Sequence, residues 1–589
     1  MKRKIIIGLS LLALAVCAGL AYVTNLPALN VNVPEYQKPG ELVTVDQGWT
    51  DAQREAFHFT AQGTRLVPYA WFMALEQPCF SLSACKLFAE PEYLGSFGFL
   101  AAKADAQRNP GGLPVGFARQ EDFHDPHTSH VEPVVGLTCA ACHTGELRYQ
   151  NYSVRLEGAP ATIEVTEFQK ALGLSMAFTQ YIPFRYGRFE DKVLGPNATD
   201  AQKSALKQRF DSFMKSAKWE VDETNRLKTY ANQAGFGRTD ALARIGNQVF
   251  AVDMANAANF AMAGAPVRFP QIWDATWFDW VQYNSSISDP MVRNIGEALG
   301  VRAVVELNGP NAAKFDNSVN IPGLHQLELL LSGSAPFQGL RSPQWPSVFP
   351  PLAAAKVARG AVLYKQHCAG CHLPPVEELL ADLKSPKPVH WWKNGQGKHL
   401  LKVTDVPLPE IGTDPRQAMD FLNRTADTGS LNKGRVSAAA GLDLVTTSIR
   451  DKFFDKMQFT PAQRIEWSGN RDPDYERVRS PTVYKARPLN GSWSIGPYLH
   501  NGSVPNLYEL LSPASERLNK FWTGSKLFDP VKLGRDTAEL KGGYLFDTSL
   551  PGNSNKGHEF TDGPKGNGVI GPKLSLDDRW ALVEYLKSI

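Results

Sequence analysis

The chain has 589 residues, and 43% of them are hydrophobic, so it can bury more than one core and is not disordered as a whole. Its 62 Lys and Arg side chains nearly balance its 59 Asp and Glu side chains, and Lys2, Arg3 and Lys4 account for the excess. This balance gives no electrostatic reason to expect binding to nucleic acid or to an anionic membrane surface.

The N-terminal segment, residues 1–25, is predicted to be a targeting signal. A basic start, Met1–Lys4, precedes the apolar run Ile5–Val23, and small residues within that run offer cleavage sites for a signal peptidase. A retained membrane anchor is the alternative, because the run approaches the roughly 20 residues that span a bilayer. Both interpretations predict that the body of the protein is periplasmic or secreted.

Helical periodicity recurs along the rest of the chain. Four prolines in Ser342–Pro351 indicate a boundary between two halves. Apolar residues at helical spacing predict helices on both sides of this boundary, at Asp51–Thr64, Tyr69–Glu76, Ala201–Ala217, Ala353–Gln366 and Ser575–Lys587. The connections between them are rich in Gly, Pro and Asn, which predicts long irregular loops.

One Cys-x-x-Cys-His motif lies in each half, at Cys139–His143 and at Cys368–His372. This is the attachment signature of c-type haem. On a helical turn the two thiols and the imidazole share one face, so the thiols can bond to the porphyrin while the imidazole meets the iron. A thiol redox pair or half of a zinc site is the alternative, and both are weaker because a histidine follows each pair directly. We therefore predict two covalently bound haems.

Two further cysteines, Cys79 and Cys85, lie outside the motifs. In an exported protein they are expected to close a small disulfide loop, with two buried free thiols as the alternative.

Several stretches resemble a known family. They are Tyr484–Trp493, Pro497–Leu507, Gln62–Thr64, Leu113–Phe117, Trp280–Asn284 and Gly552–His558. Together they resemble the di-haem cytochrome c peroxidase superfamily, in the branch of the rubber oxygenase and the di-haem fatty-acid dioxygenases and diol synthases. The resemblance implies a calcium ion as a possible further cofactor, although no local cluster of ligands indicates one.

The resemblance also implies axial ligands for each iron. His372 and His500 would close both sides of the second haem, which would then store or transfer electrons. Met457 or Met419 would replace His500 if the chain behaved like the simple peroxidases. His143 would hold the first haem from one side and leave the other side open to dioxygen or peroxide.

Large apolar side chains are concentrated between Pro266 and Tyr283. Four of them are candidates for a water-poor substrate pocket beside the first haem, with ordinary core packing as the alternative. They are Phe269, Ile272, Trp273 and Trp280.

From these observations we expect a mainly α-helical protein with long loops and few short strands. It would consist of an N-terminal haem domain over residues 26–345 and a C-terminal cytochrome c domain over residues 346–589. The expected activity is a dioxygenase reaction on unsaturated fatty acids such as oleate, giving hydroperoxides or diols. The alternatives are a polyisoprene oxygenase, a hydrogen-peroxide-dependent cytochrome c peroxidase that draws electrons from a partner cytochrome, and a non-enzymatic di-haem electron carrier.

Overall fold

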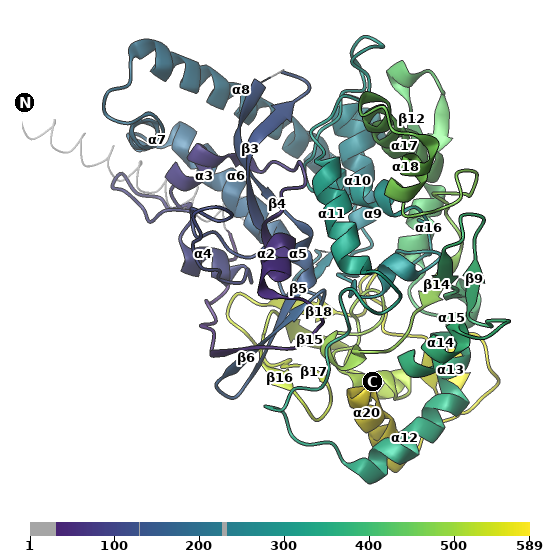
Figure 1. Cartoon of the computed structure of the whole chain (residues 1–589). Coiled ribbons are helices and arrows are strands. Elements are labelled where there is room, and N and C mark those ends of the chain that lie inside the picture. The colour runs from purple at the N-terminus through teal and green to yellow at the C-terminus, as the bar shows by residue number, and fades with distance from the viewer. Residues whose placement is uncertain (1–30, 129, 227–232) are drawn as a thin grey trace, which may run out of the picture.

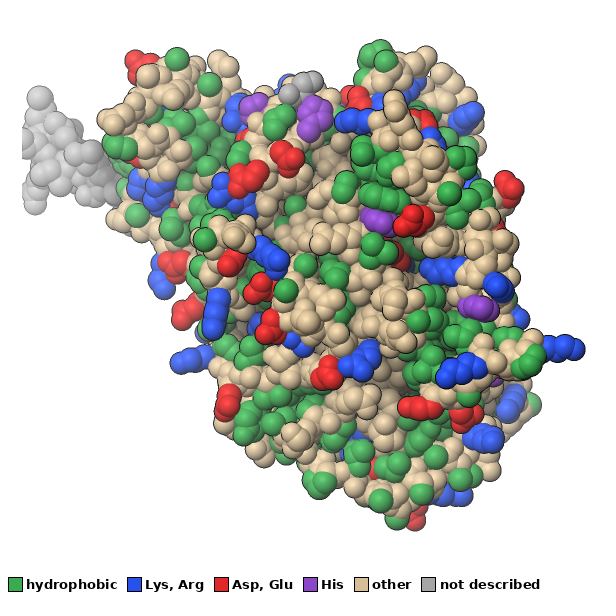
Figure 2. All heavy atoms as spheres, in the orientation of Figure 1, with side chains coloured by type: hydrophobic (Ala, Val, Ile, Leu, Met, Phe, Trp, Pro, Cys, Tyr) green, Lys and Arg blue, Asp and Glu red, His purple; other side chains and the backbone are tan. Residues whose placement is uncertain are grey.

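The computed structural model describes residues 31–128, 130–226 and 233–589 (Figure 1). The predicted targeting signal, residues 1–25, lies outside these residues. Within the described ranges no helix is both long enough and apolar enough to cross a membrane. On the face shown in Figure 2, basic and acidic side chains are interspersed, as the nearly balanced charge leads us to expect.

Two three-stranded sheets frame the first motif. Their strands are β1 (Glu41–Thr44), β2 (Val67–Pro68), β3 (Phe117–Asp125), β4 (His130–Leu137), β5 (Thr144–Tyr149) and β6 (Tyr152–Glu157). In one sheet β4 lies between β2 and β3, and in the other β6 lies between β1 and β5. The motif forms the short helix α5 (Cys139–His143), which follows β4 and leads directly into β5. Both ends of the motif are therefore anchored by strands.

Helices cover the first half around these sheets. They are α2 (Asp51–Phe59), α3 (Tyr69–Ala74), α4 (Pro91–Ser96), α6 (Val165–Tyr181), α7 (Arg185–Leu194), α8 (Asp200–Arg226), α9 (Ala241–Gly246), α10 (Pro290–Gly300) and α11 (Ile321–Ser332). The start of α2 is fixed by a capping box, in which the Thr50 hydroxyl accepts from the Gln53 N–H and the Gln53 side chain accepts from the Thr50 N–H.

The second motif lies at the end of a helix pair. Helix α12 (Ala354–His367) leads into the short helix α13 (Ala369–His372) and lies beside the C-terminal helix α20 (Leu576–Ser588), as Figure 1 shows. The crossing is tight at Gly360, where an added Cβ would lie 2.1 Å from the Ala581 carbonyl oxygen and 2.5 Å from the Tyr585 Cβ. Only glycine allows this approach, so α20 fixes the helix that carries the second motif.

The rest of the second half consists of short helices and two-stranded sheets. The helices are α14 (Val376–Leu383), α15 (Leu408–Ile411), α16 (Arg416–Asn423), α17 (Ala438–Lys456), α18 (Pro461–Trp467) and α19 (Leu507–Leu510). The paired strands include β9 (Trp391–Lys393) with β10 (His399–Leu401), β11 (Thr404–Pro407) with β14 (Val483–Ala486), β12 (Thr425–Asp427) with β13 (Arg435–Ser437), and β15 (Lys520–Thr523) with β18 (Tyr544–Asp547).

The expected fold class, mainly α-helical with few short strands, is wrong. The protein has a mixed α and β content, with many small sheets spread over both halves. Most strands are only two to four residues long, and some pair with partners remote in sequence, as β1 does with β6 and β11 with β14. Strands of this length carry no period that distinguishes them from loops, because their stability depends on the partner strand.

One hydrophobic core contains residues from both halves of the chain. Trp49, Leu147 and Trp273 share this core with Trp493 and Leu582, all of them buried. A second core lies around α10 and α17, and a third lies around α3, α6 and the first sheets. The division into two domains at residues 345 and 346 stays a prediction.

Candidate functional site

The first motif begins with a polar cap and is covered closely by a loop. The Thr138 hydroxyl oxygen accepts a hydrogen bond from the Ala140 N–H at 3.3 Å and donates one to the His58 carbonyl at 3.1 Å. Gly116, with φ of +88°, approaches so closely that an added Cβ would lie 2.3 Å from the Ala141 Cα. The small residues between the two cysteines are therefore needed for packing on this side of the motif.

His143 is held in one orientation by the backbone. Its Nδ1 lies 2.8 Å from the Pro270 carbonyl oxygen, which only accepts, so Nδ1 carries the proton and Nε2 keeps a free lone pair. Burial lowers the pKa of His143 to about 4, which keeps the ring neutral near pH 7. A neutral imidazole with Nδ1–H on a carbonyl is the form that binds a metal ion through Nε2.

The two cysteines of the first motif are reduced thiols. Cys139 and Cys142 form no disulfide, and burial raises the pKa of each thiol to about 12. Both cysteines and His143 are partly accessible. Two free thiols and one ligand-ready imidazole on one helical turn fit a covalently bound haem.

The second motif has the same arrangement. His372 Nδ1 lies 2.8 Å from the Arg487 carbonyl oxygen, and burial lowers the pKa of the imidazole. Cys368 and Cys371 are free thiols, and a Cβ added to Gly370 between them would meet nothing within 4 Å. The residues therefore fit a haem here as well, with Nε2 of His372 available to the iron.

A second imidazole, that of His558, lies close to His372. The two ring centroids are 5.9 Å apart, with the ring planes at 63°. Rings bound on opposite sides of one metal ion, each with a nitrogen about 2 Å from it, have centroids about 6 Å apart. The buried Nδ1 of His558 has no hydrogen bond partner, and burial lowers the pKa of this ring to about 3. This geometry favours His558 as the second axial ligand.

His500 lies in a different environment. Its ring stacks on Tyr484 at a centroid distance of 4.0 Å and meets the edge of Tyr283 at 6.2 Å. Burial lowers its pKa to about 3, so it is neutral. The predicted ligation of the second haem by His500 stays a prediction. Of the two methionines considered as rivals, Met457 is exposed and Met419 packs beside Tyr484.

The four apolar residues predicted to line a distal pocket do not gather in one place. Phe269 has its ring centroid 6.4 Å from that of His143, with the ring planes at 62°, and it directly precedes Pro270, whose carbonyl accepts from His143 Nδ1. Trp273 is buried in the shared core, where its Nε1–H donates to the Asn490 carbonyl, and Ile272 is partly buried beside Gly158. Trp280 donates from Nε1 to the Tyr475 hydroxyl at 3.2 Å. Their assignment to a substrate pocket stays a prediction.

Comparison with known proteins identifies a family model and relatives that this chain resembles. Residues 483–523 match a family model described as RoxA-like, cytochrome c-like. Over its whole length the chain is 42% identical, across 616 residues, to the uncharacterized protein y4iJ of Sinorhizobium fredii, and the match covers 100% of both chains. The chain belongs to the y4iJ family. It is also 28% identical to the uncharacterized protein y4iM of the same organism over 337 residues, which cover 54% of this chain and 63% of y4iM.

The RoxA-like match concerns one segment in the second half of this chain. The matched segment includes Tyr484, Arg487 and His500 and corresponds to a cytochrome c-like domain. It supports the resemblance to the branch of the rubber oxygenase and related di-haem cytochromes. A cytochrome c-like domain in turn indicates covalently bound haem c and a haem-dependent oxidoreductase.

Polar residues beside the first motif were not predicted as site residues. The Cys139 thiol donates to the Gln62 Oε1 at 3.5 Å, and Gln282 Nε2 donates to the Glu297 Oε1 at 3.1 Å. The charge of Glu297 helps to raise the pKa of the Cys139 thiol, which shows that the carboxyl is near the motif. Two residues after Gln282, the amide atoms of Asn284 are buried and have no hydrogen bond partner among the described residues. Two of these residues lie in Trp280–Asn284, a stretch that the resemblance singled out without assigning roles.

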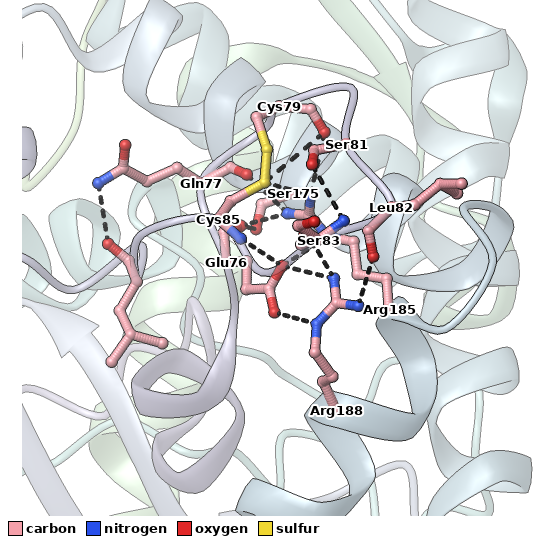
Figure 3. Close-up of a disulfide and its surroundings, with 11 residues drawn as sticks. Glu76, Gln77, Cys79, Ser81, Leu82, Ser83, Cys85, Ser175, Arg185 and Arg188 are labelled. Carbon is pink, nitrogen blue, oxygen red and sulfur yellow. Dashed lines mark hydrogen bonds and ion pairs between the residues drawn. A yellow bond between two sulfur atoms is a disulfide. The ribbon is translucent and has the colours of Figure 1, made fainter.

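A disulfide joins Cys79 and Cys85 (Figure 3). Arg185 on α7 donates to the Cys79 carbonyl at 3.2 Å, and Arg188, one turn later, donates from Nε to the Glu76 carboxylate at 2.8 Å. The loop therefore fastens to a helix of the first half and is separate from both motifs.

Calcium stays an expectation of the resemblance alone. Within the described ranges, no three His, Cys, Asp or Glu side chains are grouped so that they could hold a metal ion.

Proposed function

We propose that this protein is a di-haem c-type oxidoreductase in which the two haems have different tasks. The haem at Cys368–His372 would be closed by His372 and a second imidazole and would store or transfer electrons. The haem at Cys139–His143 would react with dioxygen and an apolar unsaturated substrate. Unsaturated fatty acids such as oleate are the proposed substrate class, with insertion of dioxygen at an allylic C–H bond to give a hydroperoxide or, further on, a diol.

The difference between the two motif histidines carries this proposal. His372 has the ring of His558 at 5.9 Å, whereas the ring contact of His143 in the described chain is with Phe269. A phenyl ring cannot bind iron, so this contact supplies no second ligand. A haem iron with a free coordination position binds dioxygen or peroxide, whereas a bis-histidine iron transfers electrons.

The protein supplies orientation and a dry environment for this chemistry. The Pro270 carbonyl fixes His143 as a neutral ligand. The charge of Glu297 acts on the Cys139 thiol, and burial raises the pKa of Glu297, which makes this carboxyl the candidate to hold or deliver a proton there. Gln282 fixes one of its oxygens.

Polyisoprene oxygenation is the second candidate, and the RoxA-like match of residues 483–523 favours it. Both candidates use dioxygen on an alkene-containing apolar substrate, so they share the same open haem. Export to the periplasm or beyond, a lipid or other apolar small-molecule substrate and a redox partner cytochrome are parts of the same proposal.

The proposal is tested by incubating the purified holoprotein with oleate and isotopically labelled dioxygen in the absence of peroxide. We expect a hydroperoxide or diol that carries the label, detected by mass spectrometry. The variant His143→Ala should form no product while it still carries the second haem. Parallel samples receive polyisoprene, or hydrogen peroxide with a reduced cytochrome.

Each outcome separates the candidates. Labelled products from polyisoprene alone would replace the fatty-acid proposal by the second candidate. Consumption of peroxide without any oxygenated product would indicate a peroxidase and contradict both. Two haems that bind neither cyanide nor carbon monoxide would exclude every enzymatic interpretation in favour of an electron carrier.

A further inference from the structure

Arg487 follows β14 and contacts the surroundings of both motifs. Its carbonyl oxygen accepts the hydrogen bond from His372 Nδ1 at 2.8 Å. Its guanidinium Nη1 donates to the Gln271 carbonyl at 2.6 Å, and Nη2 donates to the Trp273 carbonyl at 3.2 Å. The backbone of this residue therefore orients one proximal histidine, while its side chain holds a segment far away in the sequence.

That segment, residues 270–273, orients the other proximal histidine. The Pro270 carbonyl accepts from His143 Nδ1 at 2.8 Å, and the next carbonyl along the chain, that of Gln271, is the one that Arg487 binds. A continuous connection thus runs from His143 through Pro270 and Gln271 to the guanidinium of Arg487, and through the main chain of Arg487 to His372. One hydrogen bond holds each histidine, and two hydrogen bonds from the guanidinium, to the carbonyls of Gln271 and Trp273, join the two segments.

The charge of Arg487 is not neutralised by a direct ion pair. Across the described ranges, no carboxylate oxygen lies within 4.0 Å of its guanidinium, and its Nε is buried without a partner. A guanidinium is not deprotonated in proteins, so the side chain is charged at neutral pH. An isolated buried cation is costly unless an anion compensates it.

We propose that Arg487 is a positioning residue shared by the two haem sites, which ties the orientation of His143 to that of His372 and contributes its positive charge to both irons. The inference rests on the proposed binding of two haems. A positive charge favours the reduced form of a nearby iron, because reduction lowers the positive charge of the iron centre. Arg487 therefore raises the reduction potential of both haems.

The experiment compares Arg487→Met, Arg487→Lys and Arg517→Met in the full-length holoprotein. Arg517 is the matched control, because it is also a buried guanidinium whose acceptors are backbone carbonyls, including those of Gly557 and His558. It contacts the surroundings of the second motif only. Haem content is measured first, by mass spectrometry and absorption of the pyridine complexes, and each haem is then titrated by spectroelectrochemistry with electron paramagnetic resonance.

We expect Arg487→Met to shift the reduction equilibrium of both haems toward the oxidised form, by roughly tenfold each. Arg517→Met should shift that of the second haem alone. Arg487→Lys keeps the charge and should restore most of both potentials. Lysine lacks the planar guanidinium that donates to two carbonyls at once. In Arg487→Lys the segment that contains Pro270 is therefore held less firmly, so the iron–His143 stretching band of the reduced protein should move.

These readouts distinguish the inference from the proposal on which it rests. A wild-type protein with fewer than two haems would contradict the proposed function. Two haems with unchanged potentials in Arg487→Met, or a shift of one haem only, would overturn the role of Arg487. If Arg487→Met does not fold, Arg487→Lys decides: an iron–His143 band identical to that of the wild type would overturn the role, and a moved band would support it.

Discussion

Each motif histidine depends on one hydrogen bond from its Nδ1 to a backbone carbonyl. The acceptors are the backbone carbonyls of Pro270 and Arg487 and not polar side chains. A carbonyl cannot be removed by substitution, and it cannot titrate. The orientation and the neutral state of both imidazoles are therefore insensitive to pH near 7, in keeping with the lowered pKa of each ring.

The second axial ligand of the second haem can be assigned by single substitutions. We expect His558→Ala to convert this haem from a low-spin, closed form to a form that binds carbon monoxide, because His558 is the ring that lies beside His372. Absorption and electron paramagnetic resonance spectra of the reduced and oxidised protein measure the change. His558→Met, which supplies another ligand atom, should remain low-spin.

His500→Ala is the matched comparison, since His500 is also an imidazole whose pKa burial lowers to about 3, but it stacks on Tyr484. Spectra of both haems that match the wild type would agree with the geometry at His558. Opening of the second haem in His500→Ala, with His558→Ala still closed, would establish the ligand that the sequence predicts and contradict the one that the structure favours.

At the scale of elements, the crossing of α12 and α20 controls the second motif. Gly360→Val is expected to force the helices apart, because no room exists for a Cβ between Gly360 and the Ala581 carbonyl. Overpacking of this kind lowers the free energy of unfolding by about 1–3 kcal/mol. Since Cys368 directly follows α12, the content of the second haem should fall as well. Chemical denaturation and haem quantification measure both effects.

Gly173→Ala provides the control for this substitution. Gly173 lies in α6, and a Cβ there would meet nothing within 4 Å. Alanine in a helix interior is about 0.5–1 kcal/mol more favourable than glycine, so this variant should be as stable as the wild type or more stable. Equal stability of Gly360→Val and the wild type would show that the crossing can relax.

The elements differ in how well the sequence predicts them. The helices predicted at Ala201–Ala217, Ala353–Gln366 and Ser575–Lys587 are confirmed within α8, α12 and α20, because their apolar residues repeat at the period of a helix. The strands were missed, since β11 pairs with β14 and β1 with β6 across long loops that no local pattern reveals.

The residues of the candidate site were likewise predictable from the sequence only where they lie close together in the chain. The Cys-x-x-Cys-His spacing specifies the thiols and the first imidazole, because all of them lie on one helical turn. The proximity of His558 to His372, and that of Glu297 to Cys139, arises from tertiary packing of remote segments. The family resemblance singled out the stretch Gly552–His558 but assigned no role to His558.

For the whole molecule, the shared hydrophobic core predicts cooperative unfolding. Trp49 and Leu147 in the first half pack in the same core as Trp493 and Phe528 in the second. Removing either half would expose this surface, so we expect one transition in guanidinium, with the same midpoint by tryptophan fluorescence, circular dichroism and haem absorption. Residues 26–345 expressed alone should be insoluble or partly unfolded.

Two separated transitions, with the spectrum of one haem lost before the other, would contradict this expectation. They would instead support the independent domains that the sequence predicts at 26–345 and 346–589. The Gly173→Ala protein serves as a reference here too, since it changes a single helix without touching the shared core.

The Cys79–Cys85 disulfide constrains how the protein can mature. The chain needs one cysteine pair oxidised, Cys79 with Cys85, while four other thiols stay reduced until haem is attached. Cys79 and Cys85 are only six positions apart, and Arg185 on the neighbouring helix α7 donates to the Cys79 carbonyl. Closing so short a loop costs little entropy, so this pair forms before a thiol that is distant in sequence can react with either cysteine. Maturation thus depends on a reductant that spares this loop, and an expression host that oxidises every thiol indiscriminately would yield protein that can no longer accept its haems.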